Sequence, residues 1–218
     1  MCWLCDFLTS SIGKKLQVAL AGLFLCLFLV THLAGNLLLW AGPDAFNHYA
    51  KFLESQALLP VAEFGLLFLF LLHIITALWV RWENRKARPI GYQSHAWAGG
   101  RTVSSASMLY TGLIVLVFVI IHVKTMKFES AGNSLYEHVL DELKEGPASA
   151  MAIFYLAAML ALGVHLSHGV QAAARTFGVD HPKFTPAIQR VGMAFALVIA
   201  AGFGAIAFWG GFLAGVKP

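Results

Sequence analysis

Charged side chains are scarce in this sequence: Asp, Glu, Lys and Arg make up 12% of the 218 residues, whereas hydrophobic residues make up 59%. A chain with so few charges cannot cover a soluble domain with a polar surface. Its mean hydropathy is +0.72, and apolar runs long enough to cross a bilayer recur along it. We therefore expect an integral membrane protein.

Cysteine is also scarce, with three residues in the whole chain. Cys2 and Cys5 form a C-x-x-C motif, but a zinc or iron–sulfur site needs four ligands and the sequence has no second pair. We expect these two residues to lie, reduced, in a structureless terminus. Cys26 falls inside the first apolar run, where a small apolar packing residue is the simplest interpretation.

The apolar runs predict the fold. Each is near the ~20 residues that a helix needs to cross the hydrocarbon core, and lipid offers the backbone no hydrogen-bond partners, so all should be helical. The first run is longer than the ~7–15 residues of a signal-peptide core, and no A-x-A-like cleavage site follows it. We expect an all-α membrane protein, one domain over residues 1–218, with five spanning helices at residues 16–40, 58–80, 104–126, 149–174 and 190–214.

Lysine and arginine predict the orientation of these helices. Ten of the 15 lie on the side of the N-terminus if the helices alternate, which favours a cytoplasmic N-terminus and an outer C-terminus. The acidic residues show the reverse bias, so the net charge of +4 reflects topology and gives no argument for a nucleic-acid partner. The ten are Lys14, Lys15, Arg81, Arg85, Lys86, Arg88, Arg101, Arg175, Lys183 and Arg190.

Histidine is the informative residue type. Four of the nine lie in connections, where a solvated imidazole needs no explanation: His48, His95, His138 and His181. The others lie inside predicted helices: His32 in the first, His73 in the second, His122 in the third, and His165 with His168 in the fourth. One such histidine is most simply a side chain bonded to a neighbouring helix. Four consecutive helices with at least one each indicate function, because polar groups at membrane depth are costly.

The histidines sort by depth into two pairs. Counted from the nearest cation at the inner end of its helix, His32 lies at ~25 Å and His122 at ~31 Å, whereas His73 lies at ~12 Å and His165 at ~15 Å. The pairs are thus separated by ~15 Å along the membrane normal. This arrangement predicts two stacked cofactors.

Haem is the cofactor that fits two imidazoles from different helices in hydrocarbon. Zinc requires further ligands, and di-iron membrane enzymes use histidines clustered at short spacing. With both axial positions filled, haem iron is suited to passing single electrons. Short side chains near the histidines would admit a porphyrin, although ordinary helix packing also explains them; they are Ala34, Gly35, Ala77, Gly163 and Gly169.

At this point the sequence resembles a known family. The stretches SSIGKKLQVALAGLFLCLFLVTHLAGNL, AFNHYAKFLES, LFLLHIITAL and LGVHLSHGVQAAARTFG are similar to the five-helix, dihaem cytochrome b subunit of succinate dehydrogenases and quinol:fumarate reductases. The resemblance implies a membrane anchor with two haem b groups, a quinone such as menaquinone as substrate, and a bacterial inner-membrane location. It also implies two soluble partners, a flavoprotein and an iron–sulfur protein, which perform the dicarboxylate chemistry on the cytoplasmic side.

The resemblance also implies roles for individual histidines. His32 and His122 match the ligands of the outer haem, and His73 matches one ligand of the inner haem. In the fourth helix, His165 has the family's spacing to Gly169 and Gly178, the second of which ends the helix, whereas His168 is better placed for a propionate or a packing contact. The first four helices would enclose the haems and the fifth would pack outside them.

Charged residues at the membrane edges suggest further site residues. The haem propionates need cations, because an unpaired carboxylate in hydrocarbon is very costly. Arg81 and Arg175 are nearest for the inner haem, and Lys124 is nearest for the outer one. Ordinary positive-inside anchoring explains the arginines equally well.

A quinone site at the outer end would need groups that exchange protons. The first outer connection supplies Asp44, His48, Glu54 and Glu63. Glu63 is the best placed, since ~15 Å of helical rise from His73 brings it near the depth of the outer pair. A water-facing glutamate at a helix start is the alternative.

Two other function classes stay open. Haem-binding anchors of hydrogenases or formate dehydrogenases also carry histidine ligands but usually have four helices, and a haem-free transporter with a histidine proton relay would show no haem absorption. A bc-type cytochrome b is disfavoured, because it would place two haem-ligating histidines on each of two helices, whereas here the candidate ligands are spread over four helices. The direction of the reaction is also open, and Gly163 stands where some dihaem fumarate reductases have a glutamate proposed to carry protons.

Overall fold

The computed structural model describes residues 2–87, 103–129 and 134–215. Within them it is helical, and five helices are long and apolar enough to span a membrane, as the sequence predicts. These helices are α2 (Ser11–Asn36), α4 (Leu59–Lys86), α5 (Val103–Val123), α7 (Ala150–Thr176) and α8 (Thr185–Phe208). Arg88 and Arg101, which the topology argument counted, and His95, one of the histidines placed in connections, lie outside the described residues.

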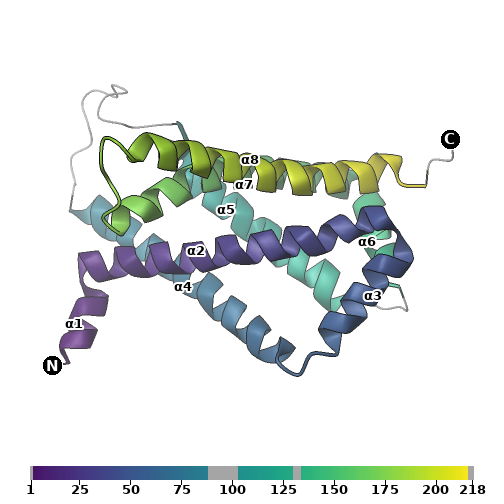
Figure 1. Cartoon of the computed structure of the whole chain (residues 1–218), viewed down its shortest axis with the longest axis horizontal. Helices are drawn as coiled ribbons and strands as arrows, with labels where there is room; N and C mark the ends of the chain where they lie inside the picture. Colours follow the sequence, from purple (N-terminus) through teal and green to yellow (C-terminus); the bar gives the residue numbers. More distant parts are fainter. Residues whose placement is uncertain (1, 88–102, 130–133, 216–218) are drawn as a thin grey trace.

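The five helices form one elongated bundle. Figure 1 shows α2, α7 and α8 along the long axis, with the N-terminus at one end and the C-terminus at the other. Helix α7 is the centre of the bundle: it packs against α8, α5 and α2, while α4 packs on α2. Of the five spans α7 is the most buried and α4 and α5 the least. Helices α4 and α5 therefore present the most apolar surface to the outside of the bundle.

Shorter helical segments occupy both ends of the bundle. Helix α1 (Trp3–Thr9) precedes α2 at the N-terminal end, while α3 (Pro43–Glu54) and α6 (Leu135–Lys144) lie at the other end (Figure 1). Single turns continue three of the long helices: η1 (Leu37–Ala41), η2 (Lys124–Phe128) and η3 (Trp209–Leu213). The prediction of a structureless N-terminus is wrong, because Cys5 lies on α1 and Cys2 immediately before it; both are free thiols.

Local sequence explains where these segments begin and end. Pro43 opens α3 at a position where its missing N–H costs nothing. The Ser134 hydroxyl caps α6 by accepting from the Glu137 N–H at 3.3 Å. Helix α7 ends at Thr176, and Gly178 two residues later has a φ of +81°, a left-handed conformation that glycine adopts without strain. The expectation that Gly178 ends the fourth spanning helix is confirmed.

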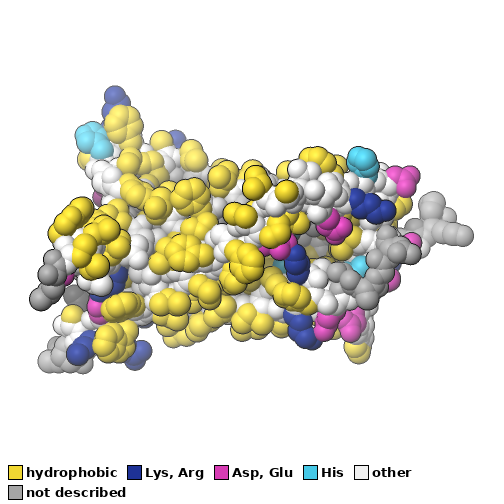
Figure 2. Space-filling model, turned by 90° about the horizontal axis from the view of Figure 1, so that it is seen from below, with side chains coloured by type: hydrophobic (Ala, Val, Ile, Leu, Met, Phe, Trp, Pro, Cys, Tyr) yellow, Lys and Arg dark blue, Asp and Glu magenta, His cyan; other side chains and the backbone are white. Residues whose placement is uncertain are grey.

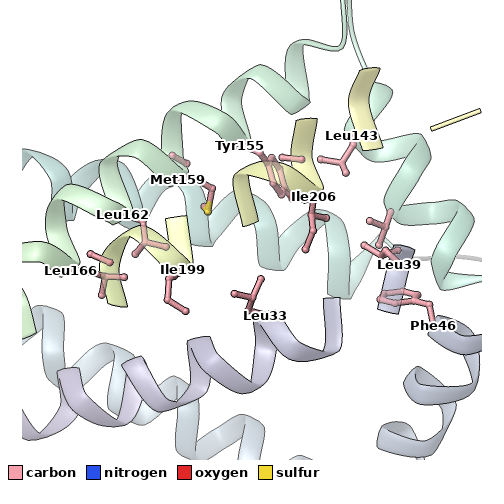
Figure 3. Packing of buried hydrophobic residues seen from close by; sticks show 14 residues of the cluster. Leu33, Leu39, Phe46, Leu143, Tyr155, Met159, Leu162, Leu166, Ile199 and Ile206 are labelled. Carbon is pink, nitrogen blue, oxygen red and sulfur yellow. The ribbon is translucent and has the colours of Figure 1, made fainter. Parts of the chain in front are cut away.

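The buried core runs along the α2, α7 and α8 contact (Figure 3). Leu33, Leu166 and Ile199 belong to this core, one from each helix. Close approach requires glycine: a methyl group at Gly163 would lie 2.9 Å from Ala200 Cβ, and one at Gly202 would lie 2.8 Å from Leu33 Cδ2. Small residues at such contacts are how membrane helices pack tightly.

The surface divides into an apolar middle and charged ends. Figure 2 shows hydrophobic side chains over the long middle part of one face, with charged side chains nearer the two ends. At the N-terminal end, the buried ammonium of Lys14 forms an ion pair with Glu83 and lies 4.8 Å from the centre of the Trp79 ring. This contact joins the start of α2 to the end of α4. The apolar middle fits a multi-pass membrane protein.

Candidate functional site

The histidines of the first four spanning helices meet as two pairs. The rings of His32 and His122 face each other with centres 5.9 Å apart and planes at 78°. Those of His73 and His165 lie 6.4 Å apart at 72°. These are the two pairs that the depth argument predicts, so α2 faces α5 at one depth and α4 faces α7 at the other. His168 is half-buried on α7 and belongs to neither ring contact.

Each ring of the His73 and His165 pair is oriented by one hydrogen bond and has room because of one glycine. His73 Nδ1 lies 3.1 Å from the carbonyl oxygen of Val18, which accepts its N–H. His165 Nδ1 lies 3.3 Å from the Thr111 hydroxyl. Gly22 and Gly112 leave room for the rings, since a methyl group at either would approach a ring Cε1 to 3.2 and 3.3 Å, respectively.

The His32 and His122 pair is packed by aromatic rings. Phe28 stacks on His32 at 5.1 Å and Phe118 stacks on His122 at 5.3 Å, each from four residues earlier in its helix. Residues four apart lie on one helix face, so each phenylalanine fixes the plane of its histidine. Phe203 of α8 closes the side of His32 at 5.6 Å. The fifth helix therefore contributes directly to this pair.

Hydrogen bonds orient the His32 and His122 pair through Nδ1. The His122 Nδ1 lies 3.0 Å from the buried Tyr155 hydroxyl, and His32 Nδ1 lies 3.4 Å from the Asn36 side-chain amide. Within the described part of the chain, Nε2 of His32, His73 and His122 has no hydrogen-bond partner. A histidine that binds a metal commonly uses one nitrogen for the metal and the other for such a bond.

The spacing of the rings fits one haem for each pair. A metal–imidazole bond of ~2 Å on each face, plus ~1.2 Å from nitrogen to ring centre, puts two axial rings ~6.4 Å apart. The observed 5.9 and 6.4 Å agree with that value. Among the described residues no three His, Cys, Asp or Glu side chains gather as a metal site.

Comparison with known proteins found a similar membrane cytochrome subunit. Over 188 residues, or 85% of this chain and 88% of the relative, the sequence is 27% identical to the succinate dehydrogenase cytochrome b558 subunit of Bacillus subtilis (strain 168). This similarity supports a place in the succinate dehydrogenase cytochrome b family. No family model matches the sequence, and no solved structure matches it significantly.

The cations that the sequence predicts for the haem propionates are dispersed at the two ends of the bundle. Arg81 is exposed on α4. Arg175 of α7 lines a shallow hollow of about 310 Å³ together with Lys15 and Thr176. Lys124 forms an ion pair with Glu129 at 2.9 Å. Arg175 is thus the cation with a hollow beside it, and Lys124 already has an anionic partner.

The residues predicted for quinone chemistry lie at the other end from Arg81. Glu63, near the start of α4, forms an ion pair with Lys127 of η2. Lys127 lies five residues after His122. His48 is exposed on α3, and within the described residues no hydrogen bond joins it to Glu63. The structure therefore brings Glu63 to the end of α5 that carries the outer histidine.

Sequence reasoning missed the residues that orient the histidines. Tyr155, Thr111 and the Val18 carbonyl come from neighbouring helices, and no motif marks them. The phenylalanines could have been found, because both outer histidines follow one in the pattern F-x-x-x-H, at Phe28 and Phe118. No motif marks Glu142 either, an acidic residue on α6 whose Oε1 is buried.

Proposed function

We propose that this chain is the membrane anchor and dihaem electron-transfer subunit of a succinate:quinone oxidoreductase or quinol:fumarate reductase. It would carry electrons between a quinone site at the outer end and an iron–sulfur subunit on the cytoplasmic side. The observation that carries the proposal is the pair of facing imidazoles at each of two depths, at 5.9 and 6.4 Å. The family of the relative agrees with it.

In this proposal His32 and His122 bind the outer haem, and His73 and His165 bind the inner one. Haem held by two imidazoles would supply one-electron transfer at each of these sites. Binding would be non-covalent, as in haem b, because the sequence has no C-x-x-C-H motif. The hydrogen bond from His73 Nδ1–H to the Val18 carbonyl holds that ring in the tautomer that leaves Nε2 free for a metal.

The inner end is the proposed docking side. Arg81 and Arg175 would meet the propionates of the inner haem there, and Lys124 those of the outer haem, after exchanging Glu129 for a propionate. We assign the N-terminus to the cytoplasmic face of a bacterial inner membrane on the lysine and arginine bias. The flavoprotein and iron–sulfur subunits, which would perform the dicarboxylate chemistry, would dock on this side.

Quinone chemistry is assigned to the opposite end. Glu63 is the proposed proton-exchanging group, with His48 as the second candidate on α3. The ion pair with Lys127 holds the Glu63 carboxylate in place, so that it can accept a proton when quinol is oxidised nearby. Menaquinone or another quinone would be the substrate.

Spectroscopy and haem counting test the proposal. The purified complex should contain two low-spin haems per chain in a pyridine haemochrome assay. His32→Ala or His122→Ala should remove the outer haem, and His73→Ala or His165→Ala the inner one. One haem or none per chain would contradict the assignment, and a chain with no haem band on reduction would favour a histidine-relay transporter. Succinate-driven quinone reduction by the complex would separate this anchor from that of a hydrogenase or formate dehydrogenase.

A further inference from the structure

Glu142 is an acidic residue at the end of the bundle where α3 and α6 lie. It lies on α6, which is held to the bundle on both sides of the glutamate. Leu143 is buried, and a methyl group added at Gly210 of η3 would come within 2.5 Å of its Cδ1. Val139, one turn earlier, is also buried. The carboxyl is therefore carried on a rigid, closely packed helix.

The carboxyl of Glu142 is only partly satisfied. Its Oε1 is buried, and within the described part of the chain this atom has no hydrogen-bond partner. An ionised carboxylate oxygen that loses water without gaining a donor is unfavourable. A protonated carboxyl is far less so, which makes this position suited to a proton that comes and goes.

A line of polar groups leads from Glu142 to the outer histidine pair. The Thr125 hydroxyl, which donates to the His122 carbonyl oxygen at 3.5 Å, lies beside the Glu142 carboxyl and the Tyr155 phenol, and the Tyr155 oxygen lies 3.0 Å from His122 Nδ1. Thr125 and Tyr155 are both buried, at 7% and 8% exposure. Figure 3 shows Tyr155 at the same end of the core as Leu143. The line therefore runs through the packed end of the bundle.

Other ionisable groups around Glu142 come from three elements. Glu145 and His138 lie on α6 itself, Glu129 and Lys124 at η2, and Tyr155 on α7. His138 Nε2 also lies 3.0 Å from the Thr125 carbonyl oxygen, which ties α6 to η2. The remaining neighbours are apolar or amide: η3 is WGGFL, and α3 meets the start of α6 through Asn47. Burial is the largest influence and raises the pKa of Glu142.

We propose that Glu142 is a positioning residue for the outer haem: it binds one proton from the outer aqueous phase for each electron that enters the His32 and His122 site. The electron would come from quinol or from an added chemical reductant, and the added negative charge is balanced by the proton on the carboxyl. The inference rests on the proposed function, because it assumes haem between these two histidines.

The sign of the effect follows from two contributions. An ionised Glu142 repels an added electron, and through Thr125 and Tyr155 it also draws on the His122 N–H, which makes that imidazole a stronger donor to iron. Both contributions lower the midpoint potential of the outer haem. Protonation removes both, so the potential should be higher at low pH. Since burial raises the pKa of Glu142, the change should fall above the ~4.3 of an ordinary glutamate.

Potentiometric titration of the complex at several pH values tests the inference. In the unaltered protein the midpoint potential of the outer haem should fall as pH rises through the pKa of Glu142. In Glu142→Gln it should stay at the high, low-pH value across the same range. Asp141→Asn is the matched control, because Asp141 is exposed on the same helix, and it should keep the pH dependence, as should Glu142→Asp.

A second measurement is independent of the potential. Reduced-minus-oxidised infrared spectra should contain a protonated-carboxyl band that Glu142→Gln lacks and Asp141→Asn retains. Two haems per chain in the variant would show that the bundle has folded. An unchanged pH dependence in a two-haem Glu142→Gln complex overturns this inference alone, whereas an unaltered chain without haem overturns the proposed function as well.

Discussion

Gly22 offers a test of how closely the inner histidine pair is built. It lies one turn after Val18 on α2, so the glycine and the Val18 carbonyl face His73 together. A methyl group at residue 22 would lie 3.2 Å from His73 Cε1 and 3.4 Å from Nδ1. Gly22→Ala should therefore push the ring away from α2 by a few tenths of an ångström.

That displacement would lengthen the hydrogen bond between His73 and the Val18 carbonyl, which is already close to the upper distance limit. His73 Nδ1 lies 3.1 Å from the Val18 oxygen, and a contact of ~3.6 Å is no longer a hydrogen bond. Overpacking a well-packed site costs ~1–3 kcal/mol, which equals a ~5- to ~150-fold loss of affinity at ~1.4 kcal/mol for each factor of ten. We expect Gly22→Ala to lower the affinity for the inner haem within this range and to spare the outer haem.

Haem titration of membranes that contain the variant measures this effect. Gly65→Ala is the matched control: it lies on α4, the helix of His73, and a methyl group there meets nothing within 4 Å. Alanine is ~1 kcal/mol better than glycine inside a helix, so the control should be neutral or stabilising. Gly112→Ala should resemble Gly22→Ala, because it approaches His165 Cε1 to 3.3 Å. Full occupancy and an unchanged spectrum of the inner haem in both variants would refute the reasoning.

Three further predictions concern single side chains. His165→Ala should remove the inner haem, whereas His168→Ala should retain it, as absorption spectra of the two variants would show; the opposite result would exchange their roles. Glu83→Gln should lower the temperature at which haem absorbance is lost more than Lys14→Met does. Removing the Glu83 charge leaves the Lys14 side chain, which is 6% exposed, as an unpaired buried charge, whereas Glu83, at 38%, stays hydrated when Lys14 is replaced. Equal shifts in the two variants would contradict this. Glu63→Gln should abolish quinone-linked turnover while succinate oxidation with a dye acceptor and both haem spectra survive, and unchanged quinone activity would remove Glu63 from the site.

Much of the bundle could be predicted from the sequence. The five spanning helices follow from apolar runs near bilayer length. The partner of each histidine also follows, because depth depends only on chain direction and on the rise per residue. His32 could be paired with His122 without knowledge of any contact between α2 and α5.

The structures at the two ends were less accessible. Helices α1, α3 and α6 are short and amphipathic or polar, so no long apolar run marks them, and the cysteines at the start of α1 suggested a structureless segment instead. The Ser134 cap and Pro43 at a helix start are sequence signals for α6 and α3. They become decisive only beside a bundle on which such short helices can pack.

The surroundings of the histidines were decided by the tertiary structure. The sequence by itself determined that four helices carry histidines and at which depths. Which residues orient the rings, among them Tyr155, Thr111 and Phe203, depends on the rotation of each helix about its axis and on its lateral neighbours. The burial of Glu142 likewise depends on how α6 folds back over η2 and α7. Depth accumulates along a chain and can be counted, whereas rotation and neighbourhood arise from side-chain packing between segments far apart in sequence.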